Sequence, residues 1–367
     1  MLTYKDLGVK PFINASGTIT TLGGSLMLPQ VIDSMRAAAT GFIDLNDLHA
    51  KAGEKLAEMI GVPAAFISCG AASGVQLSAA ACLTGTNRER IRKLPDTHDM
   101  RNEFVISMVD RHTYIHQGIE AVGGELIRVG TDHSVSAADI VKGINYNTAA
   151  VVFFLGKQSK EQLAQIVPEA KKRGVPIMID AAAQLPPRSN LTEIVEIGAS
   201  LVVFSGGKGL RGPQSSGLVV GQKEFVEAVC LNSNPHSAIG RGMKVGKEEI
   251  MGLLTAVELF LAQDEIEQLA EWNARVEHIV DALESIEGVQ AEVRSKGQQA
   301  SPDVAPRAYI TLAESCGKTP SEVIDQLRAC DPAIVARQSG NEIVIDPMTL
   351  MPGEEEVIAE QLVEALM

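Results

Sequence analysis

Short apolar runs alternate with helix-period segments through the first two-thirds of this 367-residue chain, and this alternation restricts the fold more than any other feature. Most of the runs are continuously apolar, which is typical of strands buried on both faces of a sheet. We therefore expect an α/β fold, with a mostly parallel seven-stranded sheet covered by helices and a binding site beyond the carboxyl ends of its strands. The seven predicted strands are Ala64–Ser68, Phe104–Met108, Glu125–Val129, Ala150–Leu155, Val175–Asp180, Ser200–Phe204 and Gly217–Val220. The helices expected between them are Leu48–Ile60, Ser73–Leu83, Tyr114–Val122, Ser136–Ile144, Lys160–Arg173 and Leu191–Ile197.

The pattern changes at residues 235–246, a stretch rich in glycine and basic residues. A single long helix is expected from Lys247 to about Glu284, followed by a small α+β unit. This predicts an N-terminal segment 1–25 near the active site, a large α/β domain over 26–245, and a bridging helix with a small domain over 246–367. The small domain is expected to contain strands Gln290–Val293, Arg307–Thr311, Ala333–Ala336 and Glu342–Ile345, and helices Pro320–Ala329 and Gly353–Ala365.

Charge and cysteine content exclude several classes of protein. The 32 Lys and Arg against 46 Asp and Glu give a net charge of −14, which disfavours binding of nucleic acid or anionic lipid through bulk charge. Five cysteines without a CxxC pair indicate a reducing compartment, which we take to be the cytoplasm. The start of the chain has no signal-peptide pattern, and the longest apolar run, Ala149–Leu155, falls far short of the roughly 20 residues of a membrane span.

A lysine at a predicted strand end is the first candidate for chemistry. The segment SLVVFSGGKGLRGPQSSG delivers Lys208 on a glycine-rich turn just after an apolar strand. A partly desolvated lysine loses proton affinity and becomes an amine nucleophile suited to Schiff-base chemistry. The flanking glycines would let the backbone approach a bound cofactor closely. The alternative is a surface lysine on a turn.

An acidic residue ends the preceding apolar strand in VPIMIDAAAQLPP. A carboxylate there is costly unless it is paired, so Asp180 is either a helix cap, a metal ligand, or the partner of a protonated pyridine nitrogen. An aspartate together with a Schiff-base lysine is the protein half of a pyridoxal-phosphate site.

Two further segments complete this candidate site. The small-residue turn from Ser68 to Gly74 precedes a helix and would present backbone N–H groups to an anion such as a phosphate, to which Ser205 could add a hydroxyl. The segment RHTYIH supplies a ring to stack on a pyridine, with His112 the first choice and Tyr114 the second. His112 and His116 could instead form a metal pair, but no third ligand stands at motif spacing, so no metal is expected.

The order of phosphate turn, ring, aspartate and lysine resembles that of the fold-type I pyridoxal-phosphate enzymes, which have the aspartate aminotransferase-like fold. Within them the chain resembles the selenocysteine-synthase-like branch, and most of all the D-glucosaminate-6-phosphate ammonia-lyases. The segments that carry the resemblance are Ile13–Ser25, Leu94–Glu103, Ile179–Pro187, Phe204–Gly217 and Pro332–Leu350, which together span nearly the whole chain.

The resemblance implies a role for each candidate residue. Lys208 would be the Schiff-base lysine and Asp180 the pyridinium partner, while Arg337 would bind the substrate carboxylate unless it is a surface arginine. The cofactor phosphate would be held by Gly70, Ala71, Ala72, Ser73 and Ser205. His112 and Gln184 would also contact the cofactor, and Thr18 and Tyr114 would also bind the substrate. A homodimer or larger homo-oligomer is implied as well.

The implied activity is a lyase reaction, an α,β-elimination on an amino-sugar acid. D-glucosaminate 6-phosphate would give 2-keto-3-deoxy-6-phosphogluconate and ammonia. The alternatives are another β-eliminase, an aldolase, a racemase, a selenium transferase, or a catalytically silent binding protein. Selenocysteine synthases resemble the chain but have an additional N-terminal region that handles tRNA, which favours a small amino-acid substrate here. The acid that protonates the leaving hydroxyl could be Lys208, His112, Tyr114 or Thr18.

A phosphorylated substrate would need further cations in the cleft. Arg211, three residues after Lys208, is the best candidate, with Arg241 and Lys244 in a glycine-rich loop as others. The basic run Arg88–Lys93 could equally be a solvated stretch.

Overall fold

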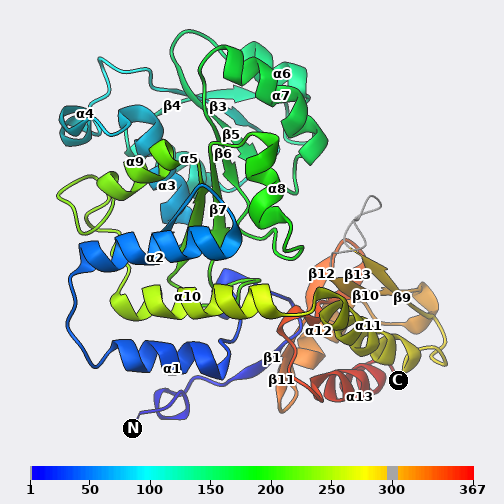
Figure 1. Cartoon of the computed structure of the whole chain (residues 1–367). Coiled ribbons are helices and arrows are strands. Elements are labelled where there is room, and N and C mark those ends of the chain that lie inside the picture. The colour runs from blue at the N-terminus through cyan, green and yellow to red at the C-terminus, as the bar shows by residue number, and fades with distance from the viewer. Residues whose placement is uncertain (1, 296–304) are drawn as a thin grey trace. The chain divides into compact units, whose positions relative to one another are not determined.

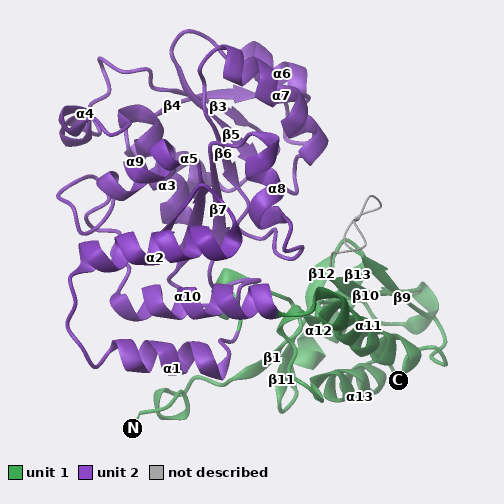
Figure 2. Cartoon of the chain, viewed as in Figure 1, with its two compact units in different colours: residues 1–25, 263–367 green, residues 26–262 purple. Residues whose placement is uncertain are grey.

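The computed structural model describes residues 2–295 and 305–367, which form two compact units (Figures 1 and 2). The large unit is Leu26–Ala262, and the small unit combines Met1–Ser25 with Gln263–Met367. The sequence places the end of the large domain near residue 245, whereas the compact unit extends to Ala262. The reason is that α10 (Lys247–Ala262) packs against α1 (Pro29–Ala38) and α2 (Leu45–Ile60).

The large unit is built on a seven-stranded sheet in the order β2-β8-β7-β6-β5-β3-β4. Only β8 runs antiparallel to its neighbours, so the expected mostly parallel seven-stranded α/β fold is confirmed. The strands are β2 (Ala64–Ser68), β3 (Glu103–Ser107), β4 (Glu125–Val129), β5 (Thr148–Phe154), β6 (Ile177–Asp180), β7 (Leu201–Ser205) and β8 (Gly217–Gly221).

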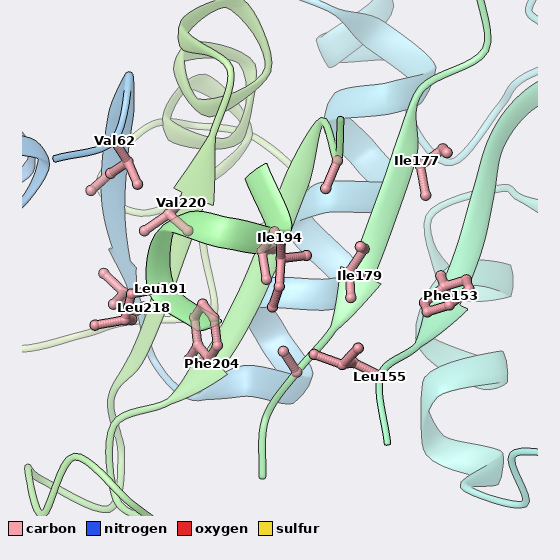
Figure 3. Close-up of a cluster of buried hydrophobic side chains, with 14 of the residues drawn as sticks. Val62, Phe153, Leu155, Ile177, Ile179, Leu191, Ile194, Phe204, Leu218 and Val220 are labelled. Carbon is pink, nitrogen blue, oxygen red and sulfur yellow. The ribbon is translucent and has the colours of Figure 1, made fainter. Parts of the chain in front are cut away.

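Helices cover both faces of this sheet, and each face has its own apolar core. Alternate residues of one strand enter opposite cores, as Ile177 and Ile179 do on one side and Met178 on the other. Figure 3 shows the core that contains Ile177 and Ile179, with Phe153 and Phe204 fully buried in it. The helices that line this core are α2, α6 (Ala137–Gly143), α7 (Lys160–Lys172), α8 (Asn190–Ile197) and α10. The core on the opposite face of the sheet is lined by α3 (Ala71–Thr84), α5 (Thr113–Ala121) and α9 (Lys223–Asn232). Continuously apolar strands are explained by this burial on both sides.

The prediction of one continuous helix from Lys247 to about Glu284 was wrong. It is two helices, α10 and α11 (Glu265–Asp281), because Asp264 adopts an extended backbone and its carboxylate accepts the N–H groups of Ile266 and Glu267 as an N-cap. Three helices were not predicted: α1, α9 and the six-residue α4 (Arg88–Lys93).

The small unit contains a four-stranded antiparallel sheet in the order β12-β13-β10-β9 and a separate parallel pair, β1 with β11. The predicted strand Ala333–Ala336 is interrupted at Ala336, so Arg337 begins the next strand. The elements are β1 (Phe12–Asn14), β9 (Val289–Ser295), β10 (Pro306–Leu312), β11 (Ala333–Val335), β12 (Arg337–Ser339), β13 (Glu342–Ile345), α11, α12 (Pro320–Ala329) and α13 (Glu354–Leu366). Nowhere in the described ranges is a helix both long and apolar enough to cross a bilayer.

Candidate active site

The candidate residues of the large unit gather at the carboxyl edge of its sheet. Ser205 at the end of β7 and Ser68 at the end of β2 both pair with Gly217 of the intervening β8. Neighbouring strands lie about 4.8 Å apart, so the ends of β2 and β7 stand roughly 10 Å from each other. Asp180 ends β6, the next strand after β7. One edge therefore carries the proposed phosphate turn, the aspartate and the lysine turn.

The turn between β2 and α3 has the features of an anion site. Gly70 caps α3 with a φ of 124°, which favours glycine, and no side chain within residues 2–295 and 305–367 caps the first-turn N–H groups. The Ser73 hydroxyl donates to the Gly70 carbonyl at 2.7 Å, so its proton is used within the turn. A Cβ at Gly217 would lie 2.5 Å from the Gly70 carbonyl carbon, so β8 approaches the turn closely only because residue 217 is glycine. The 14-residue helix α3 begins here, so the positive end of its dipole lies at this edge of the sheet.

The glycines around Lys208 make close contacts within the protein. A Cβ at Gly206 would lie 2.0 Å from the Ser216 Oγ, and one at Gly209 would lie 2.2 Å from the Leu185 carbonyl oxygen. They let the turn after β7 pack tightly against neighbouring loops, and this packing fixes where Lys208 lies. That they also let the backbone approach a bound cofactor remains a prediction.

Lys208 and Asp180 influence each other electrostatically. Burial lowers the pKa of the half-buried Lys208 amine, and the Asp180 carboxylate opposes that shift. Burial raises the pKa of Asp180, against the Ala182 N–H that its Oδ1 accepts at 2.9 Å and against the charge of Lys208. An amine that loses its proton more readily suits Schiff-base chemistry. A buried carboxyl at the same sheet edge needs a cation beside it to stay charged, and a protonated pyridine nitrogen would supply one.

His112 is the N-cap residue of α5, and sequence reasoning missed its partner. The His112 Nδ1 lies 2.6 Å from the Oδ1 of Asp110, whose side chain is only 3% exposed. The Tyr114 ring lies 5.5 Å from the His112 ring, and its hydroxyl pKa is raised by burial, by Asp180 and by Asp110. The only sequence signal for Asp110 is an acid shortly after a predicted strand and two residues before the histidine.

Gln184 and Arg211 also lie close to this edge. Gln184 packs over Gly156, where a Cβ would lie 2.4 Å from the glutamine Nε2. Arg211 has a φ of 54°, unique among the non-glycine residues that the structure describes, and its Nε donates to the Leu26 carbonyl at 3.1 Å. Such backbone conformations are uncommon outside glycine and often occur at functional sites.

The basic run Arg88–Lys93 lies far from these residues. It forms α4, which follows the 14-residue α3, so about 21 Å of helix separates it from the phosphate turn. Arg90 borders a surface cavity that also includes Asn147 and Thr148 at the amino end of β5. The run therefore belongs to the opposite edge of the sheet. Arg241 and Lys244 are exposed in the loop before α10.

Thr18 and Arg337 belong to the small unit, where two of the segments that carry the resemblance meet. Strands β1 and β11 pair in parallel, with Ile13 opposite Ile334. The Arg337 Nε is buried and has no hydrogen-bond partner among the residues described, which is the state expected of a group that serves a ligand. Thr18 is half-buried and follows Gly17, whose missing Cβ makes room for Asp346.

The groups at this sheet edge together fit pyridoxal phosphate. The uncapped turn at α3 fits its phosphate, the Lys208 amine its aldehyde, and the desolvated Asp180 carboxyl its pyridine nitrogen.

Comparison with known proteins identifies the family. The model of the family described as SelA, L-seryl-tRNA selenium transferase, matches residues 12–351. The chain belongs to the SelA family. Its fold-type I architecture is also that of a serine palmitoyltransferase with bound cofactor, which aligns over 97% of this chain and 88% of that one with a TM-score of 0.62 at 16% identity.

Two relatives match this SelA-family chain over nearly its full length. A 5'-C-glycyluridine monooxygenase-decarboxylase from Streptomyces is 31% identical, covering 100% of this chain and 92% of the relative. A D-glucosaminate-6-phosphate ammonia lyase from Salmonella typhimurium is 29% identical, covering 98% and 97%. A solved D-glucosaminate-6-phosphate ammonia-lyase structure superposes with a TM-score of 0.83 at 28% identity, over 99% of this chain and 97% of that one.

Proposed function

We propose that this protein is a pyridoxal-phosphate-dependent ammonia-lyase that acts on a phosphorylated amino-sugar acid, D-glucosaminate 6-phosphate. The products are ammonia and 2-keto-3-deoxy-6-phosphogluconate. The observation that carries the proposal is the placement of the Asp180 carboxyl at the end of β6 and of the Lys208 amine just after the adjacent parallel strand β7, at the same edge of the sheet. The ammonia-lyases to which the chain is similar over its whole length support the choice of reaction.

When bound, pyridoxal phosphate supplies an electron sink for the charge left at the α-carbon of an amino acid. Lys208 would hold its aldehyde carbon in the resting protein and, once released from it, would take the α-proton at Nζ. Asp180 would hold the proton of the pyridine nitrogen. The N–H groups at the start of α3, with Ser205, would bind the phosphate, and Gln184 would contact the cofactor.

The remaining residues would bind and orient the substrate. The buried Arg337 Nε, which has no partner in the described part of the chain, suits the substrate carboxylate, because a guanidinium binds a carboxylate through two parallel hydrogen bonds. Arg211 and Arg241 would bind the substrate phosphate, and Thr18 and Tyr114 its hydroxyl groups. His112 would stack on the pyridine ring or lie at its edge.

A second candidate reaction comes from the Streptomyces relative, which is named as a monooxygenase-decarboxylase and has slightly higher identity. That chemistry consumes dioxygen and releases carbon dioxide, whereas elimination of water and hydrolysis of the resulting enamine need neither. Dioxygen uptake therefore separates the two candidates.

The test is an assay of the cofactor-loaded protein with phosphorylated and unphosphorylated D- and L-hydroxyamino acids. We expect 2-keto acid and ammonia, with D-glucosaminate 6-phosphate turned over fastest and Lys208→Ala inactive. Faster turnover of the unphosphorylated acid would contradict the sugar-phosphate assignment. Absence of keto acid with every substrate would contradict the lyase assignment.

We further propose that the protein is cytoplasmic and forms a homodimer or a larger homo-oligomer. Four apolar side chains between residues 26 and 43 are exposed, with Phe42 fully accessible, and such side chains are usually buried against a partner. The exposed residues are Leu26, Ile32, Phe42 and Ile43. A monomer in light scattering at micromolar concentration would contradict the homo-oligomer.

The proposed compartment rests on the cysteines. All five are free thiols, which suits a reducing compartment.

A further inference from the structure

Asp110 is a buried carboxylate that the proposed chemistry does not yet use. It lies in the loop between β3 and α5, and its side chain is 3% exposed. Both of its oxygens bond to one residue: Oδ2 accepts the backbone N–H of His112 at 3.1 Å, and Oδ1 lies 2.6 Å from the His112 Nδ1. A buried carboxylate committed twice to the same histidine fixes both the backbone and the ring of that residue.

We infer that Asp110 is a positioning residue that holds His112 with its proton on Nδ1 and so makes Nε2 the atom that exchanges protons with the substrate. This inference rests on the proposed lyase function and addresses which residue protonates the leaving hydroxyl. An ionised carboxylate only accepts hydrogen bonds, so the ring nitrogen that faces it must be the donor. The neutral ring then carries its lone pair on Nε2.

The surroundings of His112 suit this role. Its side chain is 59% exposed, and no described residue hydrogen-bonds its Nε2. Tyr114 lies 5.5 Å away between ring centres, and Asp180 lies near enough for the His112 charge to act on its pKa, although burial is the largest influence there. The imidazole thus stands beside the residues proposed to bind the cofactor, with one nitrogen anchored and the other available.

In the elimination the C3–O bond breaks and its electron pair leaves with the oxygen. The protonated His112 would give its Nε2 proton to that oxygen, so that water departs, and the ring would remain neutral with Nδ1–H still on Asp110. The α-proton goes to Lys208 and is later exchanged with solvent, and His112 recovers its proton from water. The carboxylate of Asp110 stabilises the charged ring before this transfer.

The substitution Asp110→Asn tests the inference, because it should move the proton of the neutral His112 ring from Nδ1 to Nε2. The backbone N–H of His112 can only donate, so the carbonyl oxygen of the introduced asparagine must face it and the NH₂ group must face Nδ1. The neutral ring is then forced to carry its proton on Nε2. Nitrogen-15 NMR of histidine-labelled full-length protein in alkaline buffer reports which nitrogen is protonated, and His112→Gln identifies the His112 signals by their loss.

We expect Nδ1–H in the unaltered protein and Nε2–H in Asp110→Asn, with and without cofactor. We also expect kcat on D-glucosaminate 6-phosphate to fall by about 100-fold or more, as for loss of a general acid, with KM changing less than about threefold. The matched control is Asp132→Asn, which removes an equal charge from an exposed residue paired with Arg111 at 3.8 Å. It should leave both the tautomer and kcat unchanged.

Nε2–H in the unaltered protein would overturn the inference without any variant having to fold. An unchanged kcat in Asp110→Asn with a reversed tautomer would show that Nε2 transfers no proton. If the unaltered protein releases no ammonia from any substrate, the proposed function fails instead, and the NMR measurement still tests the hold of Asp110 on His112.

Discussion

We expect the buried Asp180 carboxyl to lower the stability of the cofactor-free protein above the ordinary pKa of aspartate. Burial raises its pKa above the ordinary 3.8, so the folded chain binds more protons than the unfolded chain as pH rises above that value. Its contribution to stability is complete at low pH and is lost as pH rises through the folded pKa. We expect Asp180→Asn to raise the free energy of unfolding of the cofactor-free protein at about pH 8, and to change nothing below the ordinary pKa. Lower stability of the variant in the alkaline buffer, measured by urea denaturation, would contradict this.

Lys208 should take up cofactor at a lower pH than an ordinary lysine. Burial lowers its pKa below 10.5, which enlarges the fraction of neutral, nucleophilic amine. Stopped-flow absorbance should show the rate of pyridoxal-phosphate binding rising with pH to half its maximum below pH 10.5. Because Asp180 opposes the shift, Asp180→Asn should move that midpoint to still lower pH. A midpoint that is the same in the two proteins would show that the two groups do not interact.

Some residues of the candidate site could be predicted from the sequence and others could not. Lys208 and Asp180 could be predicted because each lies at or just after the end of a continuously apolar strand. Asp110 could not, because its importance depends on a loop geometry that buries its carboxylate beside His112. The protein contacts of the glycines around Lys208 could not be predicted either, since they include segments distant in sequence.

At the level of elements, the phosphate turn depends on the close approach of β8. We expect Gly217→Ala to destabilise the protein by about 1–3 kcal/mol, because its Cβ would overlap Gly70 and Ser68 and push the turn outward. The affinity for pyridoxal phosphate should fall as well. The matched control is Gly41→Ala, where a Cβ meets no atom within 4 Å. Thermal unfolding and cofactor titration of both variants check the prediction, and equal behaviour of the two would refute it.

The strands were predictable and some helices were not, for a physical reason. Each central strand of the large sheet is buried on both faces and therefore reads as an unbroken apolar run. The break between α10 and α11 has a weaker signal, because apolar residues continue at helical spacing on both sides and only the Asp264 cap marks it. The short α4 buries a single side chain, Ile91, so it has no periodicity to detect.

At the scale of the whole molecule, we expect substrate choice to depend on cations that the fold supplies to the site. Lost charge-assisted contacts cost roughly 1.5–3 kcal/mol, or about ten- to a hundredfold in kcat/KM. We expect Arg211→Ala and Arg241→Ala to lower kcat/KM for the phosphorylated substrate by that factor and to affect its unphosphorylated analogue little. Equal losses on both substrates would mean that these arginines serve the cofactor or the fold, as the Arg211 bond to Leu26 would allow.

Family membership and fold could be inferred from segments spread over the whole chain, because the two units each hold part of the resemblance. The reaction is harder to predict. Relatives of nearly equal identity are named for an ammonia-lyase and for a monooxygenase-decarboxylase, so family membership by itself does not choose between the two reactions.

The central claim is that this site eliminates water from its substrate, so that ammonia is then released by hydrolysis, and that it does not use dioxygen. The most direct test follows ammonia, 2-keto acid, dioxygen and carbon dioxide together while the cofactor-loaded protein acts on D-glucosaminate 6-phosphate, in air and under nitrogen. The account predicts ammonia and keto acid in equal amounts, at the same rate in both atmospheres, with no dioxygen uptake. Turnover that requires dioxygen, or that releases carbon dioxide, would contradict it.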